Sequence, residues 1–72
     1  MRTFQVIADG LIEKIKAISF EDAAEKCIKK LEERTNKFLP EYEVFVIDEE
    51  DNERHLVVTP KVQKIYFVDE IK

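Results

Sequence analysis

We expect the chain to reverse direction at Asp9-Gly10, a pair that stands between two apolar runs. Asp-Gly in this setting is typical of a two-residue type I′ hairpin turn, because both turn positions need a positive φ that these residues adopt at low cost. The pair therefore predicts a β-hairpin with strands over residues 3–8 and 11–18.

A turn of two residues also sets which residues face each other across the hairpin. The predicted partners are Ala8 with Leu11, Val6 with Glu13, Phe4 with Ile15, and Arg2 with Ala17. One face is then apolar apart from Glu13, which we expect at the edge of the sheet, within reach of water. The opposite face mixes polar residues with three isoleucines: Thr3, Gln5, Lys14 and Lys16 with Ile7, Ile12 and Ile18.

An amphipathic helix is predicted directly after the hairpin. Ser19 is a favourable N-cap, and Asp22 three residues later completes a weak capping box. We expect the helix to end near Asn36, ahead of Pro40. Apolar residues recur at helical spacing along one stripe: Phe20, Ala23, Ala24, Cys27, Ile28, Leu31 and Phe38.

Three further strands complete the predicted fold. They cover residues 42–47, 54–59 and 62–68, and an acidic loop over 48–53 joins the first two. The resulting order is ββαβββ. We therefore predict a single α+β domain over residues 1–72, with one amphipathic helix on the concave face of a strongly bent, mainly antiparallel sheet.

Charge and cysteine content restrict the class of protein. Sixteen acidic and twelve basic residues give a net charge of −4, which argues against a general nucleic-acid binder because such proteins carry a basic excess. Cys27 is the only cysteine, and a lone thiol fits a reducing compartment. No signal segment opens the chain, and no apolar run approaches the ~18 residues of a membrane span. We expect a cytoplasmic protein that does not bind membranes.

The composition also bears on the source of the protein. Nine lysines stand beside two asparagines and two glutamines, and isoleucine and valine (eight and seven) outnumber leucine (four). This balance is typical of hyperthermophiles, and so predicts a thermophile or one of its viruses or plasmids. An AT-rich mesophile genome produces the same bias, so both readings stay open.

Residues that could carry chemistry are few. Cys27 lies in the predicted buried stripe and is expected to act as a core hydrophobe. His55 is the only histidine, and we expect a surface or strand-edge imidazole, because a zinc site needs about four ligands. The acidic loop resembles the start of a calcium loop, but Glu53 and Thr59 occupy the positions that need Gly and Glu. We predict no catalytic residue, no cofactor and no metal site, and therefore a protein that is not an enzyme.

Surplus apolar surface is the feature that points to a function. Along residues 42–47, Val44 and Val46 point one way while Phe45 and Ile47 point the other. One helix covers one face of a sheet, so a second apolar face remains. Either the last three strands curl into a barrel-like sheet or a second copy covers that face. The candidate interface residues are Ile7, Ile12, Ile18, Phe45 and Ile47.

The leading hypothesis is thus a non-catalytic protein-interaction or regulatory module that binds a protein partner or forms a homodimer. A second hypothesis is a nucleic-acid module that uses Lys14, Lys16 and an exposed aromatic residue on the polar sheet face. A third is an acidic decoy, in which Asp48–Glu53 imitates a run of phosphates towards a basic partner.

Overall fold

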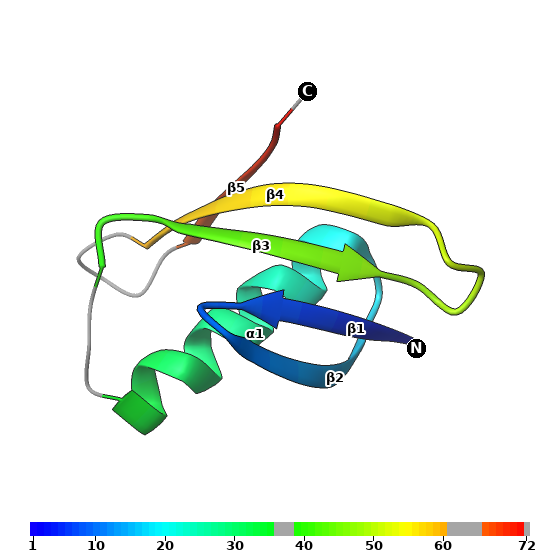
Figure 1. Ribbon diagram of the computed structural model, residues 1–72, viewed down its shortest axis with the longest axis horizontal. Helices are drawn as coiled ribbons and strands as arrows, with labels where there is room; N and C mark the ends of the chain where they lie inside the picture. Colours follow the sequence, from blue (N-terminus) through cyan, green and yellow to red (C-terminus); the bar gives the residue numbers. More distant parts are fainter. Residues whose placement is uncertain (36–38, 61–65, 72) are drawn as a thin grey trace.

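The computed structural model describes residues 1–35, 39–60 and 66–71, and it has one helix packed on a five-stranded antiparallel sheet (Figure 1). The elements are β1 (Arg2–Ala8), β2 (Leu11–Ala17), α1 (Phe20–Thr35), β3 (Tyr42–Ile47), β4 (Glu53–Pro60) and β5 (Tyr66–Glu70). Within the sheet the strands lie in the order β2-β1-β3-β4-β5. The predicted α+β class and ββαβββ order are confirmed. Residues 62–65 of the last predicted strand lie outside the described residues.

The hairpin of β1 and β2 forms as predicted. Asp9 and Gly10 both have positive φ, at 48° and 79°, and the four predicted residue pairs are all present in the register. Leu11, on the apolar face of the hairpin, is 36% exposed. Leu11 is the first residue of an edge strand, so it has a neighbouring strand on one side only.

The start of α1 is held by reciprocal hydrogen bonds. The backbone N–H of Asp22 donates to Ser19 Oγ at 3.1 Å, as expected of an N-cap. The Asp22 carboxylate in turn accepts from the backbone N–H of Ile18 at 3.2 Å, one residue earlier than in a standard capping box. The backbone N–H of Ala23 also donates to the Ser19 carbonyl. These three hydrogen bonds together set the angle at which the chain leaves β2 and enters the helix.

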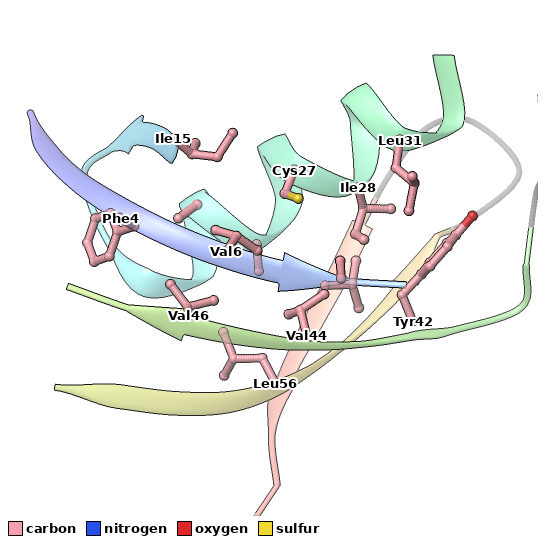
Figure 2. Close-up of a cluster of buried hydrophobic side chains, with 14 of the residues drawn as sticks. Phe4, Val6, Ile15, Cys27, Ile28, Leu31, Tyr42, Val44, Val46 and Leu56 are labelled. Carbon is pink, nitrogen blue, oxygen red and sulfur yellow. The ribbon is translucent and has the colours of Figure 1, made fainter. Parts of the chain in front are cut away.

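The core lies between α1 and the sheet face that it covers (Figure 2). Five elements contribute buried side chains: Phe4, Val6, Ile15 and Ala17 from the hairpin of β1 and β2, Ala24, Cys27, Ile28 and Leu31 from α1, and Tyr42, Val44, Val46, Leu56 and Val58 from β3 and β4. The ring of Phe20 packs edge-on against Phe4, with centroids 5.0 Å apart. Phe38, the last residue of the predicted stripe, lies outside the described residues.

Cys27 is a core residue, as predicted, with 2% of its surface exposed. Burial raises the pKa of its thiol, and the nearby charge of Glu13 adds to the effect. A nucleophilic cysteine needs the opposite, an accessible site that lowers the thiol pKa.

The central pairing of β1 with β3 joins the hairpin to the meander of β3, β4 and β5. Val6 lies opposite Val46, and Ile7 lies opposite Phe45. β2 and β5 remain at the two edges of the sheet, so the described strands do not close into a barrel. The helix contacts all five strands from one side only, as Figure 1 shows. Of the two ways to cover the second sheet face, closure within the described residues does not occur.

Candidate functional site

The sheet has one face turned away from α1, which we name the outer face. In the part of the chain that the structure describes, α1 is the single helix, and it packs on the opposite face. Alternation along the strands and the cross-strand register place these residues on the outer face: Thr3, Gln5, Ile7, Ile12, Lys14, Lys16, Glu43, Phe45, Ile47, Glu53, His55, Val57, Phe67 and Asp69.

An apolar row crosses three neighbouring strands of the outer face and continues to an imidazole on a fourth. Ile7 on β1 is the register partner of both Ile12 on β2 and Phe45 on β3. Phe45 is in turn the partner of His55 on β4, and the two rings are stacked with centroids 4.3 Å apart and planes 10° from parallel. Directly opposed side chains on neighbouring strands touch one another. We name the set Ile12, Ile7, Phe45 and His55 the cross-strand row.

Much of the cross-strand row is open to solvent. Ile12 is 63% exposed and Phe45 is 38% exposed. Monomeric soluble proteins rarely expose contiguous apolar patches larger than a few hundred Å², and larger patches mark sites of interaction. The row is contiguous because the register aligns its four residues at one level of the sheet.

The other two predicted interface residues differ in position. Ile47 lies one level along the sheet, opposite Gln5, and it therefore adjoins the cross-strand row. Ile18 follows the end of β2, six residues from Ile12, which is ~20 Å along a strand. It is 71% exposed but does not belong to the row. The structure thus brings together four of the five predicted interface residues and separates Ile18 from them.

His55 was not predicted to take part in this surface. His55 is the third residue of an interior strand and so does not lie at a strand edge, but its side chain is 31% exposed on the outer face, as expected of a surface imidazole. Its Nε2 lies 3.5 Å from a carboxylate oxygen of Glu43. Within the described residues that buried nitrogen has no hydrogen-bond partner. The acidic loop of five residues between β3 and β4 left the register of the two strands open, so the sequence had no signal for the ring stack.

A hollow adjoins the cross-strand row beside the hairpin turn. It encloses about 510 Å³ and is open to solvent. Ile7 and Phe45 line it from the row, and Asp9, Glu41 and Glu43 add three carboxylates. Acidic side chains therefore border the cross-strand row where it meets this hollow.

Charge on the outer face is divided between its two sides. Lys14 and Lys16 lie on β2, whereas Glu53 and Asp69 lie on β4 and β5. In the described ranges no carboxylate lies within 4.0 Å of either lysine. One side of the face is thus basic, and the other is acidic.

Lys14 and Lys16 also line a second surface, between β2 and α1, which we name the lysine groove. It is an open groove of about 530 Å³. Lys26, Lys29 and Lys30 line it from the helix, and its other lining residues are Ile15 and Glu33. No aromatic residue is among them. The exposed aromatic residue of the nucleic-acid hypothesis was expected on the sheet face, where Phe45 and Phe67 are 38% and 54% exposed; the lysine groove has none among its lining residues.

The acidic loop is organised by Asp48, whose side chain is 3% exposed. Its Oδ1 accepts hydrogen bonds from the backbone N–H groups of Glu50 (2.9 Å) and Asn52 (2.8 Å), and its Oδ2 accepts from Arg2 at 3.1 Å. Burial acts to raise the pKa of Asp48, but the hydrogen bond that the Asn52 side-chain amide donates to Oδ2 (3.1 Å), the two backbone bonds and the charge of Arg2 outweigh it and lower the pKa. This carboxylate is therefore engaged within the loop and is not presented to a partner.

Two classes of site are not found among residues 1–35, 39–60 and 66–71. No group of three or more His, Cys, Asp or Glu side chains in these ranges could hold a metal ion. No helix in them is long and apolar enough to cross a membrane.

Comparison with known proteins returns no relative: neither a family model, nor a curated protein, nor a solved structure matches this chain. The geometry of the two surfaces is therefore the basis for inferring a function.

Proposed function

We propose that this chain is a non-catalytic interaction module that forms a homodimer through the outer face of its sheet. The observation that carries the proposal is the cross-strand row, a contiguous apolar band on a face that α1 leaves uncovered. Burying such a band removes apolar surface from water, at ~25 cal/mol for each Å². A second copy presents the same patch, and a two-fold axis pairs that patch with itself where it is self-complementary.

A two-fold axis parallel to the strands, placed between β1 and β3, pairs the outer face with itself. The axis sets β1 against the partner's β3 and β2 against the partner's β4. A rotation about an axis parallel to the strands does not change how far along a strand a residue lies. Ile7 therefore meets the partner's Phe45, and Ile12 meets the partner's His55. Stacked sheets pack ~10 Å apart and ~30° from parallel, so the contact is closest at Ile7 and Phe45 near the axis.

The same axis matches the charges of the face. One level along from the cross-strand row, the register order is Lys14, Gln5, Ile47 and Glu53. The axis sets Lys14 against the partner's Glu53, and symmetry repeats the pair on the other side. Two opposite-charge pairs thus border the apolar band. Such pairs act mainly on orientation and partner choice, and they favour this alignment over one that sets β2 against β2.

The test is the mass of the protein in solution, measured by sedimentation equilibrium from ~1 to ~200 μM. Phe45→Glu places a charge in the centre of the apolar band, and it is expected to convert a dimer into a monomer because burying an unpaired charge is costly. Ile18→Glu is the matched control: it adds the same charge at an exposed isoleucine outside the row and should leave the dimer intact.

Two results would overturn the proposal. The first is a monomer mass for the unmodified chain over the whole concentration range. The second is dissociation by Ile18→Glu together with a dimeric Phe45→Glu. Circular dichroism of both variants establishes that each retains the fold, so that a change in mass reports on the interface.

A further inference from the structure

The lysine groove is a second surface, and the outer-face dimer does not explain it. Five of the nine lysines of a chain with net charge −4 gather there, from two elements. In the described ranges no carboxylate lies within 4.0 Å of Lys14, Lys16, Lys29 or Lys30. Lys26 is engaged, with Asp22 at 3.2 Å. Like charges repel, so gathering them has a cost that an anionic ligand would offset.

The backbone of β2 borders this groove with its free edge. In a hairpin closed by two residues, Ala8 and Leu11 form a hydrogen-bonded pair, and bonded and non-bonded pairs alternate from there. Ile12, Lys14 and Lys16 therefore direct their N–H and C=O groups away from β1. One observed contact agrees: Lys26 Nζ donates to the Lys16 carbonyl at 3.2 Å. In the described chain β2 has no further strand on that side.

We propose that the lysine groove binds an extended acidic peptide, which adds to the edge of β2 as a further strand. A strand added ~4.8 Å from β2 lies along the groove, and its side chains point alternately to the two sides of the sheet. On the helix side they meet Lys26 and Lys30, and on the outer side they meet Lys14 and Lys16. The ammonium of Lys29, which also lines the groove, lies 5.9 Å from the ring centre of Tyr66 on β5, the opposite edge strand. Both sets of peptide side chains therefore face cations.

Two features favour a peptide over a nucleic acid. Single-stranded nucleic acids are held by stacking on aromatic side chains as well as by cations, and no aromatic residue lines the groove. The open backbone groups of Ile12 and Lys14 match the spacing of another β-strand, which a phosphate backbone does not share.

Lys26 protects the edge of β2 from unwanted strand pairing in the unbound chain. Lysines near an edge strand discourage such pairing, and the ammonium of Lys26 donates a hydrogen bond to the carbonyl of Lys16, which another strand would otherwise use. An incoming peptide N–H would take that carbonyl, and Lys26 would be released to pair with an acidic side chain of the peptide. The exchange favours acidic strands over neutral ones.

The binding test uses a fluorescein-labelled decapeptide of glutamate, read by fluorescence anisotropy at ~50 mM salt. Lys26→Glu combined with Lys30→Glu is expected to weaken binding by at least about tenfold, since it reverses two charges on the helix side of the groove. The matched control, Lys26→Arg with Lys30→Arg, keeps both charges and should bind within about twofold of the unmodified protein. Neither pair of substitutions alters the outer face, so the mass of the dimer should not change. The peptide-binding proposal can therefore be refuted while the dimer proposal stands, and the reverse.

A second comparison tests strand addition itself. Lys14→Pro removes an N–H that β1 does not use, at an edge position where proline is tolerated, whereas Lys14→Ala removes the charge alone. Strand addition predicts that Lys14→Pro binds the peptide at least about fivefold more weakly than Lys14→Ala. Circular dichroism confirms that each variant is folded.

Three outcomes would overturn the proposal. One is no binding of the decapeptide at ~50 mM salt. Another is equal binding by Lys14→Pro and Lys14→Ala, which would indicate charge attraction without strand pairing. The third is tighter binding of a single-stranded or duplex oligonucleotide of equal charge, which would assign the groove to nucleic acid.

Discussion

The hydroxyl of Tyr66 donates a hydrogen bond of 2.6 Å to the carboxylate of Glu32, and it thereby ties β5 to the last turns of α1. Glu32 is 6% exposed, beside the core residue Leu31. A buried carboxylate needs a donor to replace its water, and in the described chain Tyr66 provides it. Burial and this bond raise the pKa of Tyr66 to about 12.

Tyr66→Phe is expected to destabilise the fold by ~1–3 kcal/mol, because the Glu32 carboxylate loses its donor while it stays buried. Urea unfolding followed by circular dichroism measures the loss. Adding Glu32→Gln to Tyr66→Phe should cost less than the sum of the single changes, because the charge that needed the donor is gone. Strict additivity of the two changes would show that the bond contributes little.

Alkaline pH should reveal the same bond. The folded-state pKa of Tyr66, about 12, lies above the unfolded value of ~10. Its contribution to stability is therefore complete below pH ~10 and is lost as the pH rises towards ~12. The melting temperature of the unmodified chain, measured from pH 9 to 12, should fall more steeply than that of Tyr66→Phe. Parallel curves would contradict the assignment.

Acid pH should act through Asp48, whose pKa is lowered in the folded chain by its bonds to Asn52 and Glu50 and by Arg2, against the effect of burial. A lowered folded-state pKa stabilises the fold above the unfolded value of ~3.9, and the contribution is lost as the pH falls through the folded value. Asp48→Asn should lower the melting temperature at pH 7 and flatten its decline from pH 5 to 2. Arg2→Gln, which keeps the loop bonds, should flatten it less.

The charge pairing in the proposed dimer predicts a reciprocal result. Lys14→Glu should weaken self-association, because it sets two acids against each other at both symmetric positions. Combining it with Glu53→Lys restores opposite charges and should recover most of the affinity. Sedimentation equilibrium of the single and double variants supplies the comparison. A double variant no stronger than Lys14→Glu alone would refute this alignment, even if the chain is a dimer.

The first half of the fold follows from local rules. Asp9-Gly10 demands a two-residue turn, the turn sets the hairpin register, and the register sorts the apolar residues onto one face. Ser19 then starts α1 because its hydroxyl accepts the N–H of Asp22 three residues on. Each step involves residues close in the chain, so each could be read from the sequence.

The candidate surfaces depend on contacts between distant residues, and the sequence predicted them only in part. Ile7, Ile12 and Phe45 were expected on one face, but their alignment requires β1 to pair with β3. The stack of Phe45 on His55 requires the register of β3 with β4, which the five loop residues between these strands left undetermined. Lys14 and Lys16 were expected on the polar sheet face, whereas the groove also needs the helix lysines beside them.

By itself the sequence determined the elements of this protein, the hairpin register, and the burial of Cys27 in the helix stripe. Periodicity, capping and turn chemistry act over a few residues and are written in the order of the chain. Only the tertiary structure decided the strand order β2-β1-β3-β4-β5, the cross-strand row and the bond of Tyr66 to Glu32. Each of these depends on contacts between residues that are far apart in the sequence. The arrangement that buries the most apolar area in the whole domain determines which of those contacts form.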